Sequence, residues 1–474
     1  MSLKKNFFKN ILTVGFFAYL AQAFSYLASI FIFRIISPEE YGVVSMIVVF
    51  SGFIAIFSDA GFSFSVIRGN YNEDFLQRLS GATVLFGLLL SLILALFAQP
   101  ISWFYGSPEL LTPTLCLATT FFLQSFSIIP KAKLQKEEAF KFIGIATVAT
   151  QGANSAVQLT LAYLGFSYWA FIWGPIVGYT IQACMYLWKT KLIITYGNAR
   201  ETQKVISEVK SLVGHVSGFN LINYWARNSD YLMIGKLYDK ATLGVYRNAY
   251  FLLMLPLNFV GLVVNQVLLP TLQKVIDTGQ SIEKEYKYVE GAVTLLMLPV
   301  SLLFIIFPEP FIQLLWGEKW RGVAEYLPYF GVLCYCQATL YPIGVAFVLL
   351  KKEKEMFKAG GFNALVLIVA IVSGAFISVK MMVFTYSVAY FLICCPIVIY
   401  IGFIKSFGFD KQQAISYWLP RLLLGLAMLI GIHFDYLMVA YVALGLLSVL
   451  TIVKEYSKVF WVWNYIFEHL KTKV

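Results

Sequence analysis

The dominant pattern in this 474-residue sequence is a series of apolar runs separated by short polar segments. A helix of about 20 apolar residues crosses the hydrocarbon core of a bilayer. The runs do not alternate as strands of a membrane barrel would, so helices are expected to satisfy the backbone within the lipid. The pattern predicts fourteen spans near residues 11–33, 42–66, 79–104, 109–129, 142–164, 167–189, 212–234, 246–270, 289–307, 323–350, 358–379, 383–405, 417–434 and 437–453.

Composition supports a chain surrounded mostly by lipid. Hydrophobic residues make up 59% of it and charged residues only 13%, whereas soluble domains carry about 25% charged residues. The formal net charge of +11 comes from basic residues between the apolar runs. Membrane orientation and anionic lipid headgroups explain this charge better than nucleic acid does.

The basic residues also predict an orientation. If the N-terminus is cytoplasmic, 27 of the 36 Lys and Arg residues fall in cytoplasmic segments, 7 in outer segments and 2 within spans. Positive charge favours the cytoplasmic side, so both termini of this multi-pass protein are expected in the cytoplasm. The aromatic and charged tail 454–474 is expected to lie as an amphipathic helix on the inner leaflet.

Two weak matches indicate an internal repeat. The start of the second span, with Ser37 and Gly42, corresponds to Asp239 and Gly244 at an offset of 202 residues. Ser and Asp are helix-capping residues, and a capping residue followed by Gly suggests a tight turn between two antiparallel helices. Later in each half, residues 138–141 match residues 355–358.

The repeat predicts two lobes of six helices with the same topology, related by a pseudo-two-fold axis along the membrane normal. Two further helices would follow, giving an all-α integral membrane fold. The expected divisions are an N-terminal lobe 1–189, a cytoplasmic linker 190–211, a C-terminal lobe 212–405, two extra helices within 406–453 and the tail 454–474.

Polar residues form a stripe on the seventh predicted span. Asn220, Asn223, Arg227 and Asp230 are spaced three, four and three residues apart, which places them on one face of a helix. A charge near the bilayer centre costs on the order of 2.5–3.5 kcal/mol on insertion scales. The stripe therefore predicts either a substrate-binding surface facing a central cavity or an ion pair that fixes this helix to a neighbour.

Other charges within or near the spans also need an explanation. Asp59, in the inner half of the second predicted span, is interpreted either as a proton or sodium site, a role Asp230 could share, or as a partner of a cation such as Arg68. Arg421 is expected to extend toward the cytoplasmic surface. Arg34, Lys236 and Arg247 lie near the outer ends of spans, where they could bind a diphosphate or anchor the helices at the interface.

Several kinds of chemistry find no support in the sequence. It contains no GxxxxGK[ST] nucleotide-binding motif, and neither a cofactor nor a catalytic residue is predicted. The six cysteines lie within apolar runs without the spacing of a metal site, and Cys334, Cys336, Cys394 and Cys395 are expected on helix surfaces.

Two segments carry a resemblance to a known family. One is residues 35–42, IISPEEYG, which lead into FSDAGF at 57–62; the other is NYWARNSDYLMIGKL at 223–237, followed by LGVY at 243–246. Together they resemble the polysaccharide-exporter branch of the MOP superfamily, the Wzx-type O-antigen and colanic-acid flippases.

The resemblance implies transport of undecaprenyl-diphosphate-linked oligosaccharide from the cytoplasmic to the periplasmic leaflet. Alternating access between two lobes, driven by an H⁺ or Na⁺ gradient, is the mechanism it implies, and polysaccharide-assembly proteins are possible partners. The two extra helices are similar to those of the lipid II flippases, in which the pair forms a groove for the lipid tail.

Two other functions are weighed against this one. A MATE-like exporter of small cationic compounds has the same fold and would leave polysaccharide unaffected. A polysaccharide polymerase or polyprenyl-linked glycosyltransferase would need a large outer loop or an acidic catalytic motif. The outer loop at 308–322 is short, so an enzyme is not expected.

Overall fold

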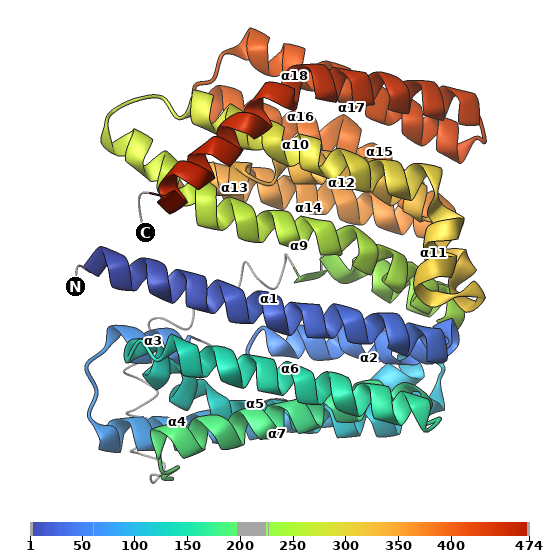
Figure 1. Cartoon of the computed structure of the whole chain (residues 1–474). Coiled ribbons are helices and arrows are strands. Elements are labelled where there is room, and N and C mark those ends of the chain that lie inside the picture. The colour runs from blue at the N-terminus through green and yellow to red at the C-terminus, as the bar shows by residue number, and fades with distance from the viewer. Residues whose placement is uncertain (1–2, 60, 197–223, 226, 472–474) are drawn as a thin grey trace. The chain divides into compact units, whose positions relative to one another are not determined.

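The computed structural model describes residues 3–59, 61–196, 224–225 and 227–471 (Figure 1). Regular structure in this part of the chain is helical throughout. Residue contacts divide the chain into two compact units, 1–244 and 245–474. The two are described separately below, and the lobe and linker boundaries at 189 and 212 stay predictions.

The first unit is a bundle of long helices. Its members are α1 (Leu3–Ile35), α2 (Pro38–Ala55), α3 (Phe62–Arg68), α4 (Glu73–Tyr105), α5 (Leu111–Lys136), α6 (Phe140–Tyr163) and α7 (Ala170–Thr190). The most extensive packing joins α4 to α5, α6 to α7 and α1 to α6. Short 3-10 turns at Pro108–Leu110 and Ser167–Trp169 lead into α5 and α7.

The second unit begins within α9. Its helices are α9 (Lys240–Asp277), α10 (Glu283–Ile306), α11 (Pro308–Trp316), α12 (Leu327–Leu340), α13 (Ile343–Leu349), α14 (Glu353–Ala375), α15 (Val379–Ala389), α16 (Cys395–Val398), α17 (Lys411–His433) and α18 (Leu437–Lys471). Two π-helical segments, Tyr390–Cys394 and Ile399–Ser406, flank α16. They keep residues 379–406 helical past Pro396, whose ring removes a backbone donor.

Eleven helical segments of the described chain are long and apolar enough to cross a membrane. Each of them coincides with one of the predicted spans. The predicted spans 142–164 and 246–270 lie on α6 and α9, and most of 212–234 lies outside the described residues. The prediction of an all-α membrane protein is confirmed, whereas the count of fourteen stays a prediction.

The second predicted span, 42–66, is wrong as a single helix. α2 ends at Ala55 and α3 begins at Phe62. Between them, Gly61 has a φ of 83°, which is in the left-handed region that glycine adopts without strain. Because the residues on both sides of this turn are apolar, residues 42–66 form one apolar run that is long enough to be read as a single span.

The helix caps predicted from the repeat are confirmed. The Ser37 hydroxyl accepts a hydrogen bond from the Glu40 amide, and the Glu40 carboxylate accepts one from the Ser37 amide at 2.7 Å, forming a capping box. The Asp239 carboxylate accepts from the Thr242 amide at 2.7 Å at the start of α9. Each cap satisfies backbone donors that the first helical turn leaves open.

The two glycines of the repeat meet where α2 and α9 begin. A β-carbon on Gly42 would lie 1.9 Å from the Lys240 carbonyl oxygen, and one on Gly244 would lie 2.0 Å from the Pro38 carbonyl oxygen. All four residues belong to the first unit. Only residues without a side chain allow the two backbones this close approach.

The last two helices form a hairpin across a short turn in which Asp435 has a φ of 59° (Figure 1). α18 also packs against α10. It runs for 35 residues without interruption, so the predicted span 437–453 and most of the predicted tail form one helix.

The expectation that four of the cysteines lie on helix surfaces is wrong for all four. Cys334 and Cys336 on α12, Cys394, and Cys395 on α16 are all buried. The sulfur atoms of Cys336 and Cys395 lie 3.3 Å apart, and both thiols are free. Small, polarizable thiols serve here as apolar contacts between helices.

Candidate functional site

The helical segment after the undescribed stretch packs on α2 in the first unit. The rings of Tyr224 and Trp225 lie 5.9 and 5.1 Å from the ring of Phe53. The Tyr224 hydroxyl donates to the Val49 carbonyl oxygen. A β-carbon on Gly52 would lie 2.5 Å from that hydroxyl, so a glycine at this position makes the contact possible. These contacts fix the start of the segment that carries Arg227 and Asp230.

The predicted polar stripe is only partly within the described chain. Asn220 and Asn223 lie outside the described residues. Arg227 is exposed and Asp230 is buried, with 3% of its surface accessible. An Asp230 carboxylate oxygen accepts from the Tyr231 amide at 2.8 Å. The helix therefore places an exposed cation and a shielded carboxylate one turn apart, and a substrate-binding role for the stripe stays a prediction.

The three predicted outer cations belong to different units. Arg34 is exposed in the last turn of α1, and Lys236 is also in the first unit. The Lys236 ammonium donates to the Phe104 carbonyl oxygen and lies 4.9 Å from the centre of the Phe104 ring. Arg247 is half-buried on α9 in the second unit. A common diphosphate site formed by all three remains a prediction.

Asp59 lies in the turn between α2 and α3 rather than within a helix. Its side chain is exposed, and a carboxylate oxygen accepts from the Ser63 amide at 2.9 Å. The Asp59 carbonyl oxygen accepts from the Phe62 amide at 2.8 Å. The residue thus helps to start α3, and its carboxylate is accessible to an ion. The ion-coupling role stays a prediction.

The expectation that Arg421 extends to the surface is wrong. Its side chain is 1% exposed, and Nη2 lies 2.7 Å from Oε1 of Glu455, which is fully buried. Nε donates to the Tyr335 hydroxyl at 3.2 Å, and Nη1 donates to the Tyr417 carbonyl oxygen at 2.6 Å. The guanidinium is fully partnered inside the unit and therefore has no reason to reach water.

The pair extends into a polar network between α10, α12, α17 and α18. The Lys458 ammonium lies 2.6 Å from the second carboxylate oxygen of Glu455. The Tyr335 hydroxyl is 2.7 Å from the Thr451 hydroxyl. The guanidinium carbon of Arg421 lies 3.7 Å from the centre of the Tyr417 ring, a cation–π contact.

Sequence reasoning missed this network because the predicted last span stopped at residue 453. Glu455 was assigned to the tail, so Arg421 had no acidic partner at its depth. One signal was available: an arginine inside an apolar run needs a partner. Glu455 is the nearest carboxylate along the helix that follows Arg421 across the short turn.

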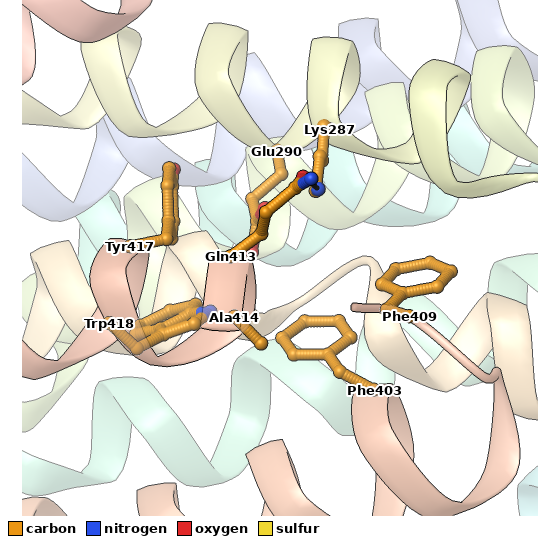
Figure 2. Close-up of a pocket in the computed structure, with 8 residues that line it drawn as sticks. All are labelled: Lys287, Glu290, Phe403, Phe409, Gln413, Ala414, Tyr417 and Trp418. Carbon is orange, nitrogen blue, oxygen red and sulfur yellow. Dashed lines mark hydrogen bonds between the residues drawn. The ribbon is translucent and has the colours of Figure 1, made fainter. Parts of the chain in front are cut away.

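A pocket opens beside the network in the second unit (Figure 2). It lies between α10, α17 and the segment that follows residue 402. Its polar lining includes Glu290 and Tyr417, with Lys287 and Gln413 at the exposed end. The remaining lining is apolar or aromatic: Phe403, Phe409, Ala414 and Trp418. Glu290, whose carboxylate lies in this largely aromatic pocket, was not identified from the sequence.

The described residues include no group of three or more His, Cys, Asp or Glu side chains that could hold a metal ion. What the described chain offers instead is charge: a shielded carboxylate at Asp230, an accessible one at Asp59 and a buried network around Arg421.

Curated relatives are proteins of polysaccharide biosynthesis. The chain is 23% identical over 355 residues to the lipopolysaccharide biosynthesis protein WzxC of Escherichia coli, covering 72% of this chain and 69% of that protein. It is 22% identical to the succinoglycan biosynthesis transport protein ExoT of Rhizobium meliloti, covering 65% of this chain and 62% of that protein.

Solved structures share the fold. The lipid II flippase MurJ in an inward closed conformation matches with a TM-score of 0.65 at 15% identity, covering 93% of this chain and 99% of that chain. An inward-facing multidrug resistance MATE family transporter of the MOP superfamily matches with a TM-score of 0.63 at 14% identity, covering 83% and 95%. These similarities confirm the predicted MOP/MATE-like fold.

The family itself is shown by a model match. The model described as "Polysaccharide biosynthesis protein" matches residues 31–325, which is more than half of the chain. The match includes both segments on which the resemblance to the polysaccharide exporters rests. This chain belongs to the polysaccharide biosynthesis protein family.

Proposed function

We propose that the protein is a flippase that moves a polyprenyl-diphosphate-linked oligosaccharide across the bacterial inner membrane by alternating access. Two findings together support the proposal. The chain belongs to the polysaccharide biosynthesis protein family, and it shares its fold over 93% of its length with a lipid II flippase. A membrane protein of this family, with that fold, is suited to carry a lipid-linked glycan.

Several charged and polar residues would contact the substrate. Arg34, Lys236 and Arg247 would bind the diphosphate near the outer ends of their helices, because guanidinium and ammonium groups are strong phosphate donors. Asn220, Asn223 and Arg227 would contact the polar part of the glycan along the seventh span. The Lys236 ammonium already lies beside a carbonyl oxygen and a ring, which would hold it in place for a phosphate.

The proposed driving force is an H⁺ or Na⁺ gradient acting at Asp59 and Asp230. Asp59 is exposed at a turn, where an ion can reach it, whereas Asp230 is shielded. A carboxylate whose surroundings change during a transport cycle would bind and release an ion at different stages. Both termini would face the cytoplasm, as the distribution of Lys and Arg predicts.

The test is transport by the purified protein in vesicles loaded with a short-chain polyprenyl-diphosphate oligosaccharide. We expect the glycan to become accessible to a glycosidase on the opposite side of the vesicle membrane. Accessibility should rise faster with an imposed H⁺ or Na⁺ gradient and should not rise in vesicles that contain the glycan but no protein. Deletion of the gene should abolish surface polysaccharide and accumulate the lipid-linked precursor. Intact polysaccharide, together with efflux of cationic dyes, would instead favour a MATE-like exporter.

A further inference from the structure

Glu290 is a buried carboxyl group that no ion pair explains. It lies on α10, is 3% exposed and lines the pocket beside α17 (Figure 2). Its Oε1 atom accepts no hydrogen bond within the described chain. Buried polar atoms are nearly always hydrogen-bonded, so an orphan atom of this kind points to a partner that is a water, an ion or a proton.

The neighbouring cations are already engaged elsewhere. Arg421 directs its three nitrogens at Glu455, Tyr335 and Tyr417. Lys458 is paired with Glu455. Lys287, three residues before Glu290, is hydrogen-bonded to Glu283 at 2.5 Å and to Gln413 at 2.7 Å. Glu290 is therefore the carboxylate that this network leaves without a dedicated cation.

Two hydroxyls near Glu290 are also orphans. Tyr286 lies one helical turn earlier on the same face of α10, and Tyr417 lines the same pocket. Neither hydroxyl makes a hydrogen bond within the described part of the chain. A phenol can donate to a carboxylate or accept from a carboxylic acid. The surroundings of Glu290 therefore suit both of its protonation states.

We propose that Glu290 is a proton-binding site whose occupancy controls how the α17–α18 hairpin is held against α10. The proton would come from water at the exposed end of the pocket, past Lys287 and Gln413, and would form an O–H bond at Oε1. Because Oε1 is bonded to neither phenol in this structure, a side-chain rotation would then let that hydroxyl donate to the oxygen of Tyr417 or Tyr286. Deprotonation would return the proton to water and leave the carboxylate to accept from the same phenols.

A metal cation fits this site less well than a proton. Sodium needs several oxygen ligands, and it would sit beside the positive charges of Arg421, Lys458 and Lys287. A proton needs no ligand shell. The titratable and charged groups around Glu290 are Tyr286 and Lys287 on α10, Tyr335 on α12, Tyr417 and Arg421 on α17, and Glu455 and Lys458 on α18.

Charge balance links the proton to the hairpin. Arg421 and Lys458 carry two positive charges, which Glu455 and an ionised Glu290 together neutralise. Protonation of Glu290 leaves one positive charge in excess inside the network. Because α18 contributes Glu455 and Lys458 and α10 contributes Glu290, the packing of these helices should respond to pH. The use of this response to drive transport rests on the proposed function, whereas proton binding does not.

Proton binding can be measured directly on the full-length protein in lipid nanodiscs. Infrared difference spectra recorded as pH is raised should show a carboxylic-acid C=O band that disappears in the wild type. The band should be absent in Glu290→Gln and retained in Glu283→Gln, which removes a carboxylate on the same helix. An unchanged band in a folded Glu290→Gln protein would overturn the proposal, as would the absence of any such band in the wild type.

A second variant covers the case in which Glu290→Gln does not fold. Tyr417→Phe removes one hydroxyl and keeps the ring under Arg421. We expect the carboxylic-acid C=O band of Glu290 to disappear at a pH that is higher than in the wild type by about half a unit or more. The reason is that the ionised carboxylate loses one hydrogen bond, which is stronger to a charged group than to a neutral one. Tyr400→Phe, at an exposed position, is the matched control. Midpoints identical to the wild type in both Tyr417→Phe and Tyr286→Phe would contradict the proposal.

The two proposals can fail separately. If no lipid-linked glycan is moved but the band titrates, the flippase function fails and the proton site stands. If transport proceeds and the band is unaffected by Glu290→Gln, the proton site fails and the flippase function stands. Amide hydrogen exchange in α17 and α18, measured at two pH values and corrected for the intrinsic pH dependence of the exchange chemistry, adds the structural readout: the protection should change with pH in the wild type and not in Glu290→Gln.

Discussion

Arg421 and Glu455 form an ion pair at 2.7 Å whose side chains are 1% and 0% exposed. The pair connects α17 to α18, and the Tyr335 hydroxyl on α12 accepts a further hydrogen bond from Nε of Arg421. Two opposite charges that are completely shielded from water depend on each other, because either one alone would be a buried, uncompensated charge.

Removal of one member of the pair should therefore be costly. We expect Glu455→Gln or Arg421→Met to lower the free energy of unfolding by about 3–5 kcal/mol. The double variant Arg421→Met/Glu455→Leu should lose less than the sum, since neither member of this pair is left uncompensated and the Lys458 side chain, which loses Glu455 as a partner, is 20% exposed. Thermal unfolding in detergent measures this, with exposed Arg321→Met as the control. Strictly additive losses would mean that the two charges are not coupled.

The close approach of α18 to α10 depends on Gly291. A β-carbon there would lie 2.2 Å from a carboxylate oxygen of Glu455 and 2.5 Å from Cδ of Lys458. Gly291→Ala should displace both side chains and cost about 1–3 kcal/mol of stability, as overpacking does. Gly445→Ala on α18, where a β-carbon meets nothing within 4 Å, should be neutral or stabilising. Equal unfolding temperatures for the two variants would rule out this role for Gly291.

The crossing of α2 and α9 should tolerate no side chain. In Gly42→Ala and Gly244→Ala the new methyl group would meet a backbone carbonyl at about 2 Å, which cannot rotate away. We expect poor yields of folded protein and loss of polysaccharide in a deletion strain carrying either variant. Gly152→Ala on α6 has open space at the β-carbon and should behave as the wild type. Normal polysaccharide in both variants would show that the helices separate at little cost.

The predicted stripe on the seventh span can be tested through its two described charges. Arg227→Ala and Asp230→Ala should each reduce surface polysaccharide at normal protein levels, and Arg227→Lys should partly restore it. Arg227 is exposed and Asp230 is buried, so a purely structural role predicts a stability loss for Asp230→Ala alone. Immunoblots and gel filtration separate these cases, and full polysaccharide in both variants would remove the stripe from the mechanism.

Asp59 offers a change of charge with little change of structure. Asparagine caps a helix about as well as aspartate, so Asp59→Asn should keep the hydrogen bond to the Ser63 amide and leave α3 in place. If Asp59 couples an ion to transport, the vesicle assay should lose most of its acceleration by an imposed gradient. An acceleration equal to that of the wild type would leave Asp59 as a helix cap only.

Hydropathy predicted the helices well because lipid leaves the backbone no alternative. It failed where local turn chemistry acts inside an apolar run, as at Gly61. It also failed where a helix continues into charged sequence. Glu455 lies beyond the apolar part of α18 and is nevertheless fully buried. Partnerships such as Glu455 with Arg421 depend on which helices pack together, and periodicity along one helix carries no information on that.

The contacts of Gly42 and Gly244 are counterparts, because Gly42 faces Lys240 and Gly244 faces Pro38, and each pair is offset by the same 202 residues. Reciprocal contacts of this kind are isologous: each segment presents the same positions to the other, as the two sides of a two-fold symmetric contact do.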